Sequence, residues 1–204
     1  KELKYGVSVT GLIDPNRIVT NSGARPDDVL FLTRRLGTGL ITTGIKREKV
    51  DDRVAQAAIE EMARLNRKAS ELMIAHGAHA ATDITGYGLM GHALEMAAGS
   101  EVTLHLISSA LPQLPEVLPL AAAGMIPGGA NANREFVEGK WSAESSVDPN
   151  LIHLMFDPQT SGGLLIAIPE AKAEAFAAEL QANDLPHTPI GRVTAAEDFP
   201  LIVE

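Results

Sequence analysis

The sequence predicts an α+β fold in which a mixed β-sheet is flanked by helices. Two observations lead to this fold class. Short runs rich in Val, Ile and Leu, typical of strands, are interspersed with longer runs whose apolar residues recur at helical spacing. The two kinds of run do not alternate strictly, so a Rossmann fold is not expected. With 204 residues, 45% of them hydrophobic, the chain is long enough to bury one substantial core.

In the first half of the chain, clusters of Gly, Pro and Asp separate the expected elements. The most regular pattern lies between residues 51 and 75, where apolar residues recur every three or four positions and predict one long helix that stops at Gly77. The pairs Asp51-Asp52 and Glu60-Glu61 are expected on its solvated face. The other elements expected in this half are strands over residues 4–12, 29–33 and 102–107 and a helix over about residues 86–98.

In the second half, Asp148-Pro149 is typical of a helix N-cap followed by proline at the first helical position, which predicts a short helix over residues 150–156. Prolines within residues 111–124 predict a short, broken helix. The polar residues 128–146, which open with Gly128-Gly129, are expected to form a long surface loop. The remaining expected elements are strands over residues 164–168, 188–193 and 201–203 and an alanine-rich helix over residues 169–182.

Charge and composition exclude several classes of function. The formal net charge of −9 argues against nonspecific nucleic-acid binding, which depends on clustered Lys and Arg. The sequence has no Cys, so these residues contain no disulfide, thiolate metal site or cysteine nucleophile. No apolar run reaches the roughly 18 residues of a membrane span, and no signal-type stretch follows the charged start. We therefore expect a cytoplasmic protein that binds neither nucleic acid nor membrane.

A segment rich in Gly and Thr, residues 81–92, carries a single acid, Asp83, ahead of an expected helix. One interpretation is structural: Asp83 or Thr85 would accept hydrogen bonds from the free amides of the first helical turn. The other is functional. Glycines permit close approach of a phosphate, the amides and the helix dipole favour an anion, and Asp83 adds an oxygen ligand for Mg²⁺. The residues alone leave both interpretations open.

A second segment, residues 157–165, reads Asp-Pro-Gln-Thr-Ser-Gly-Gly-Leu-Leu. It is typical of a tight turn before a strand, with glycines at positive φ and hydroxyls closing local hydrogen bonds. It lacks the Gly-Lys-Ser or Gly-Lys-Thr ending of a Walker A loop. The histidines do not form an HExxH pattern, although His92 and Glu95 could share a helix face, so capping or packing is expected of them.

Six segments, in order along nearly the whole chain, resemble selenophosphate synthetase, also called selenide, water dikinase. Short glycine motifs are weak singly, but six in sequence form a specific signal. The resemblance implies the reaction of ATP, selenide and water to selenophosphate, AMP and phosphate, with Mg²⁺ required. It also implies a fold like the C-terminal domain of aminoimidazole ribonucleotide synthetase and a homodimeric intact enzyme. The six segments are residues 4–11, 36–39, 62–66, 81–92, 127–133 and 157–165.

The resemblance divides the chain into a strand and linker from an N-terminal domain, residues 1–14, and a C-terminal domain that contacts ATP, residues 15–204. The nucleophilic Cys or selenocysteine of the family and its nearby Lys belong to the N-terminal domain. No catalytic residue is therefore expected in this chain, which would be inactive alone. The absence of Cys is consistent with such a fragment.

The same resemblance implies the residues of the site. Asp83 matches the aspartate that contributes to Mg²⁺ at the ATP phosphates, and Thr82, Thr85 and Gly86 are expected to shape the same ATP-binding loop. The other matching positions carry no assigned ligand contact, and Ala132 stands before Asn133 where many relatives have a basic residue. Those unassigned positions are Asn66 and Gln159-Thr160-Ser161.

Two alternatives remain open from the sequence. One is another ATP-using enzyme of the same superfamily, such as thiamine-phosphate kinase or the carbamoyl dehydratase of hydrogenase maturation. The segment of residues 157–165 favours the selenium enzyme over these. The other alternative is a binding module that presents its surface to a partner and performs no chemistry.

Overall fold

The computed structural model describes residues 6, 8 and 10–204, and these contain a mixed seven-stranded sheet. The strand order is β2-β5-β1-β6-β3-β7-β4. Neighbouring strands are antiparallel except that β7 runs parallel to β3 and to β4. The predicted α+β class with a mixed sheet is confirmed. The strands are β1 Val29–Leu32, β2 Ala80–Asp83, β3 Val102–Leu106, β4 Trp141–Ala143, β5 Leu164–Ile168, β6 Pro189–Ala195 and β7 Leu201–Val203.

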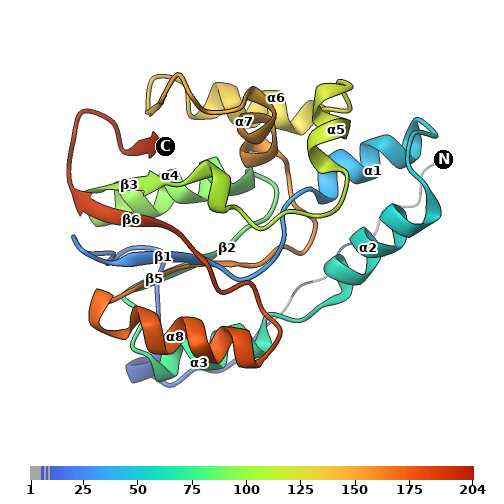
Figure 1. The fold of residues 1–204 in the computed structure, drawn as a ribbon. Helices are drawn as coiled ribbons and strands as arrows, with labels where there is room; N and C mark the ends of the chain where they lie inside the picture. Colours follow the sequence, from blue (N-terminus) through green and yellow to red (C-terminus); the bar gives the residue numbers. More distant parts are fainter. Residues whose placement is uncertain (1–5, 7, 9) are drawn as a thin grey trace.

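Helices cover both faces of the sheet (Figure 1). Helices α3 and α8 lie on one face, α4 to α7 lie on the other, and α1 and α2 extend from one end of the sheet. None of the helices in the described residues is long and apolar enough to cross a membrane. The helices are α1 Thr38–Lys46, α2 Asp52–Ala63, α3 Arg67–Ala75, α4 Gly88–Ser100, α5 Val117–Ala122, α6 Gly128–Phe136, α7 Pro149–Phe156 and α8 Glu170–Ala182, with 3-10 turns at η1 Pro15–Arg17 and η2 Ser108–Ala110.

The sheet is buried on both faces, which gives the molecule two apolar layers. Successive side chains of a strand point to opposite faces, so Leu165 and Ala167 of β5 join the larger cluster, beneath α4 to α7. Ile166 and Ile168 join the smaller cluster, beneath α3 and α8. There Phe31 and Phe176 meet edge to face, with ring centroids 5.1 Å apart. Strand β5 therefore contributes to both layers, and its first two residues, Leu164 and Leu165, are the last two of the second motif segment.

The single helix predicted over residues 51–75 is wrong, because two helices, α2 and α3, occupy this range. The chain becomes extended at Arg64, with φ −66° and ψ 147°, although the apolar spacing continues. The Glu61 carbonyl accepts hydrogen bonds from the Arg64 amide and from the Arg34 guanidinium, and the Arg64 carbonyl accepts from the same guanidinium. Glu61 was expected on the solvated face, but it is buried and accepts a hydrogen bond from the Arg35 amide.

The long loop predicted over residues 128–146 is also wrong, since helix α6 and strand β4 lie there. Two Gly and two Asn lower the intrinsic helix propensity of α6, so local sequence did not indicate it. Burial of Ala130, Asn133 and Val137 against the rest of the domain stabilises the helix instead. Helix α1 and strand β2 were likewise not predicted, and both depend on contacts described below.

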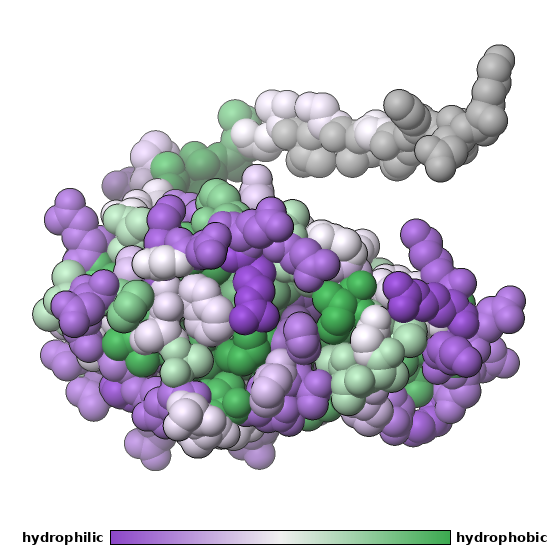
Figure 2. Space-filling model, turned by 90° about the horizontal axis from the view of Figure 1, so that it is seen from above, coloured by the Kyte–Doolittle hydropathy of each residue, from purple (hydrophilic) through white to green (hydrophobic). Residues whose placement is uncertain are grey.

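The other predicted elements are confirmed within a few residues. Strands β5 and β7 have the predicted bounds, and α7 begins after an Asp148 side chain that accepts a hydrogen bond from the Asn150 amide. The strand predicted over residues 4–12 falls largely outside the described residues, and those that are described there belong to no strand. Leu12 and Ile13, which precede η1, are exposed. Figure 2 shows hydrophobic residues on the surface at one edge of the body of the molecule.

Candidate functional site

The two motif segments, far apart in sequence, lie side by side in the structure. Strand β2 pairs antiparallel with β5, so that Asp83 stands opposite Leu164 and Thr82 opposite Leu165. Beyond the strands, the Ile84 amide donates to the Gly163 carbonyl at 2.8 Å, and the Gln159 amide donates to the Thr85 carbonyl at 3.0 Å. The turn of residues 157–163 therefore supports the loop that carries the predicted site residues.

That loop connects β2 to α4 and places all four predicted site residues on one stretch of chain. Asp83 and Gly86 are exposed, whereas Thr82 and Thr85 are half-buried. A Cβ added at Gly86 would meet nothing within 4 Å, so the space beside it is open. Asp83 and Thr82 also border an open hollow of about 480 Å³, together with Val19, Asn21, Met73, Ala81 and Leu164.

The capping interpretation of Asp83 and Thr85 is wrong. The residue before α4 is Tyr87, and no side chain caps this helix. Asp83 instead ends strand β2, and the Thr85 hydroxyl lies 3.1 Å from Nε2 of His92. The Asp83 carboxylate therefore accepts no hydrogen bond from the first amides of α4, and the amide of Gly88 donates to the Thr85 carbonyl instead.

Asp83 can supply one ligand to a magnesium ion, but it does not by itself form a complete magnesium site. Among the described residues, no group of three or more His, Asp or Glu side chains is placed to hold a metal ion. Proteins commonly bind Mg²⁺ through one or two carboxylates and complete its shell with water and substrate phosphates. A single exposed carboxylate beside an open hollow meets that requirement only when a phosphate ligand or a further chain segment supplies the rest.

The second motif segment caps helix α1. Gln159 Oε1 accepts hydrogen bonds from the amides of Gly37 and Thr38 at 3.1 and 3.2 Å and from the Thr38 hydroxyl at 3.1 Å. Asp157 Oδ2 accepts from the Gly39 amide at 2.9 Å. These side chains satisfy amides that no residue of α1 itself could reach. Residues 36–39, which matched a family motif without an assigned role, therefore form the start of a helix held by the second motif.

The turn predicted over residues 157–163 forms, but its glycines serve close packing. Ser161, rather than either glycine, has a positive φ of 53°. A Cβ at Gly162 would collide with the Ile84 carbonyl, and one at Gly163 would lie 2.7 Å from the Cβ of Arg34. Within the described residues the Thr160 and Ser161 hydroxyls make no local hydrogen bond either, and the Thr160 amide donates to the Thr38 hydroxyl at 3.0 Å.

Asp157 is a fully buried carboxyl group that the sequence did not single out as unusual. Burial raises its pKa to about 7, against the opposing effect of hydrogen bonds from the Leu40 amide, the Gln159 side chain and the Gly39 amide. Its Oδ1 has no hydrogen-bond partner. A Cβ at Gly39 would collide with this carboxylate, so glycine is required there for the contact to form.

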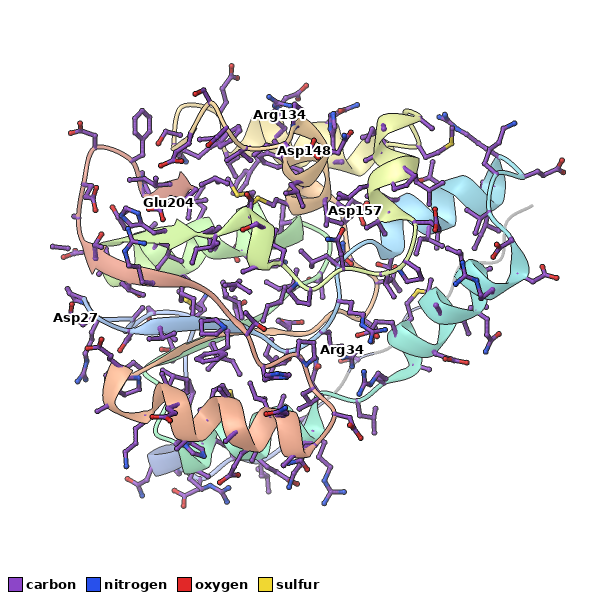
Figure 3. All side chains as sticks on the ribbon, in the orientation of Figure 1. Asp27, Arg34, Arg134, Asp148, Asp157 and Glu204 are labelled. Carbon is purple, nitrogen blue, oxygen red and sulfur yellow. The ribbon has the colours of Figure 1, made fainter. Side chains whose placement is uncertain are left out.

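Arg34 ties the same turn to the break between α2 and α3. Its guanidinium, buried from water, donates to the Glu61 carbonyl at 2.8 Å and to the Ser161 carbonyl at 2.6 Å, and also to the Arg64 carbonyl. Burial lowers the pKa of Arg34 from its ordinary value. Nearby, Asn66 Nδ2 donates to the Gly162 carbonyl at 2.9 Å. Figure 3 shows Arg34 and Asp157 at the end of the sheet nearest α1 and α2.

Sequence reasoning missed Arg34, although a signal was present. A basic residue stands two positions after the apolar run of β1, separated from it by Thr33, and a buried Arg requires several acceptors. Asn133 was noticed only by its resemblance to family members. Its Nδ2 donates to the carbonyls of Gly86 and Phe156 at 2.9 and 3.1 Å, so it fixes the site loop against α7.

Five of the six histidines lie within hydrogen-bonding or ion-pair distance of a polar partner among the described residues. His92 Nδ1 lies 3.1 Å from Glu95 Oε2, which confirms that the two share one helix face. His79 Nδ1 lies 2.8 Å from Asp28 Oδ1, and His76 Nε2 lies 3.3 Å from Glu179 Oε1. Only His92 lies next to the predicted site residues.

Comparison with known proteins gives one family and a consistent set of relatives. The family described as "AIR synthase related protein, C-terminal domain" matches residues 25–204. "Selenide, water dikinase 2" of Peptoclostridium acidaminophilum is 41% identical over 204 residues, which are 100% of this chain and 58% of that protein. "Selenide, water dikinase" of Geobacter metallireducens is 45% identical over 202 residues, 99% of this chain and 59% of that protein. The chain thus spans less than two thirds of the curated relatives it matches.

Solved structures share the fold at low sequence identity. Hydrogenase maturation protein HypE of E. coli superposes with a TM-score of 0.62 at 20% identity, covering 92% of this chain and 50% of that one. A HypE in complex with ATP gives 0.56 at 24% identity, with 92% and 48% coverage. Thiamine monophosphate kinase of Aquifex aeolicus gives 0.57 at 20% identity, with 91% and 52% coverage. These likenesses concern the fold alone.

Proposed function

Because the chain belongs to the AIR synthase related protein family, C-terminal domain, and its curated relatives are selenide, water dikinases, we propose that it is the C-terminal domain of such an enzyme. The reaction is then the conversion of ATP, selenide and water to selenophosphate, AMP and phosphate. Residues 15–204 form the domain that contacts ATP, and residues 1–14 form a strand and linker that lead into it. The observation that carries the proposal is the pairing of the two family-like segments, which fixes Asp83 beside an open hollow.

In this proposal Asp83 supplies one oxygen ligand to a magnesium ion that also contacts the ATP phosphates. Bound magnesium neutralises the triphosphate and polarises it for attack. Thr82, Thr85 and Gly86 shape the loop around the phosphates. The open space beside Gly86 admits a phosphate oxygen, and the amides and dipole at the start of α4 favour its negative charge. The chain supplies positioning and charge balance, while the nucleophile comes from the part of the enzyme that this chain does not cover.

The same proposal extends to the oligomeric state, location and substrates of the intact enzyme. The intact enzyme is a homodimer in the cytoplasm, with ATP and selenide as its substrates. The thiamine-phosphate kinase alternative shares the fold but has no observation in its favour, because its likeness is 20% identical and the dikinases exceed 40%. The binding-module alternative does not account for a carboxylate left free of helix capping beside an open loop.

The test replaces Asp83 with Asn in a protein of the relatives' full length that contains this chain, called the full-length protein below. Selenide-dependent AMP formation should fall by about 100-fold, because the neutral amide binds a magnesium ion far more weakly than a carboxylate does. The matched control is Asp198→Asn, an exposed aspartate far along the chain in the loop before β7, which should keep full turnover.

Undiminished AMP formation by Asp83→Asn would contradict the proposed role of Asp83 as a magnesium ligand. If the unaltered full-length protein formed ADP from ATP with thiamine phosphate, and no AMP with selenide, the kinase alternative would replace the dikinase.

A further inference from the structure

Thr85, His92 and Glu95 form a chain of side-chain contacts at the start of α4. His92 Nε2 lies 3.1 Å from the Thr85 hydroxyl, and His92 Nδ1 lies 3.1 Å from Glu95 Oε2. The His92 side chain is 9% exposed and that of Glu95 is 40% exposed. The Tyr87 ring meets the imidazole edge-on, with centroids 5.7 Å apart and planes at 76°. The imidazole is therefore held in one orientation from three sides.

In a neutral imidazole, whose ring nitrogens donate or accept according to the tautomer, the two partners set the direction of both hydrogen bonds. An ionised carboxylate only accepts, so the bond to Glu95 requires the hydrogen of the neutral imidazole to be on Nδ1. Nε2 then has a lone pair and no hydrogen. It accepts the hydrogen of the Thr85 hydroxyl, which is the single hydrogen that this hydroxyl has to donate.

The rest of Thr85 is fixed as well. Its backbone carbonyl accepts from the amides of Gly88 and Gln159, each at 3.0 Å, and the next carbonyl, that of Gly86, accepts from Asn133. The main chain that carries the hydroxyl is therefore held in place, and the contact with His92 orients the side chain. The two lone pairs on Oγ1 are the remaining hydrogen-bonding capacity of the Thr85 side chain.

A hydroxyl oxygen whose hydrogen is already donated can only accept hydrogen bonds. At a nucleotide site it therefore distinguishes groups that can donate a hydrogen bond from groups that can only accept one. A bare phosphate oxygen also offers only lone pairs and is repelled. A water molecule bound to a metal ion presents hydrogens that are more acidic than those of free water, and such a donor is well matched to this acceptor. Thr85 stands two residues after Asp83 on the same loop.

We infer that His92 and Glu95 are positioning residues that present the Thr85 hydroxyl as an acceptor for a water molecule bound to magnesium. The inference rests on the proposed function for the presence of that ion. It assigns Thr85 to the hydration shell of the metal instead of to a phosphate oxygen, and it gives His92 and Glu95 a role in metal affinity without direct contact with the metal.

The variant that separates this role from simple support of the loop is Glu95→Gln. It preserves the size of a half-exposed side chain, but an amide both donates and accepts, so it no longer requires the hydrogen on Nδ1. The His92 tautomer is read from the ¹⁵N shifts of the neutral ring in histidine-labelled full-length protein. We expect the Nδ1–H form in the unaltered protein and a shift toward the Nε2–H form in Glu95→Gln.

Metal affinity is the second readout and requires no turnover. Mn²⁺ binding in the presence of a non-hydrolysable ATP analogue is measured by electron paramagnetic resonance. We expect about tenfold weaker binding for Glu95→Gln and for Thr85→Val, by analogy with other residues that orient the ligands of a metal. Thr85→Ser keeps the hydroxyl and should bind as the unaltered protein does. Glu174→Gln, an exposed position on α8, is the matched control.

The Nε2–H tautomer in the unaltered protein would overturn the inference, and so would unchanged Mn²⁺ affinity in both Glu95→Gln and Thr85→Val. Equal weakening in Thr85→Ser and Thr85→Val would also overturn it, because loss of the hydroxyl would then not be the cause. A failure of the proposed function is distinguishable from a failure of this inference. It is seen as the absence of selenide-dependent AMP formation, which is measured separately from the His92 tautomer and the Mn²⁺ affinity.

Discussion

Asp157 and Arg34 are ionisable groups with almost no contact with water, and both act on backbone rather than on each other. Asp157 satisfies amides at the start of α1, and Arg34 satisfies carbonyls at the end of α2 and in the turn before β5. Buried polar groups of this kind are stable only when hydrogen-bonded, and their removal leaves the partner groups unpaired. Single side chains thus connect segments more than 100 residues apart, as the separation of 118 residues between Gly39 and Asp157 shows.

Asp157 should make folding stability depend on pH. Burial raises its pKa from 3.8 to about 7, so the folded state holds a proton that the unfolded chain releases between these values. Its contribution to the free energy of unfolding is therefore largest below pH 4, falls as the pH rises to about 7, and is constant above. Over this range the loss amounts to at most about 4 kcal/mol.

Asp157→Asn removes the ionisation and retains an acceptor for the Gly39 amide. Urea unfolding at pH 5 and pH 8 should show the variant gaining stability relative to the unaltered protein as the pH rises. Asp198→Asn should leave the pH dependence unchanged. A parallel pH dependence in Asp157→Asn and the unaltered protein would show that Asp157 is already ionised when folded at pH 5.

At the scale of elements, the break between α2 and α3 is a tertiary effect. Apolar spacing runs through both helices, and local propensity alone would join them. The Arg34 guanidinium takes the carbonyls at the end of α2, and Asn66 in the break donates to the Gly162 carbonyl. Hydrogen bonds from Arg34 and Asn66 therefore connect the break between α2 and α3 to the turn of the second motif segment.

Arg34→Met should destabilise the protein by about 3 kcal/mol, because the carbonyls of Arg64 and Ser161 lose the guanidinium donor and that of Glu61 keeps only the Arg64 amide. Hydrogen exchange should then increase first at the end of α2 and in residues 159–163, while α8 stays protected. Arg67→Met, which removes an exposed pair with Glu71, should cost less than about 0.5 kcal/mol. Equal losses in the two variants would contradict the role of Arg34.

At the scale of the whole molecule, the chain presents one wall of the proposed nucleotide site. Asp83 and Gly86 are exposed on a loop that the sheet, α4, α6 and the second motif turn hold in place. No further acidic or histidine side chain among the described residues completes a metal site there. Since the relatives are considerably longer than this chain, the proposal assigns the remaining ligands to the part of the enzyme outside it.

Isothermal titration of residues 1–204 with Mg²⁺ and ATP should therefore give a dissociation constant of roughly 1 mM or weaker, because most phosphate and base contacts are absent. The full-length protein should bind the same ligand at least about 100-fold more tightly. Micromolar binding by residues 1–204 would contradict the division of the site between two domains.

The sequence by itself determined the fold class and the bounds of β5, β7 and α7 within a residue or two. Those features depend on short-range patterns, in which period, caps and turn residues act over a few positions. Only the tertiary structure decided the break after α2, the start of α1, the pairing of β2 that ends at Asp83, and the hydrogen bonds of Thr85. In each of these, the partner of a backbone amide, a carbonyl or a side chain comes from another segment, and no local pattern encodes which distant group will satisfy it.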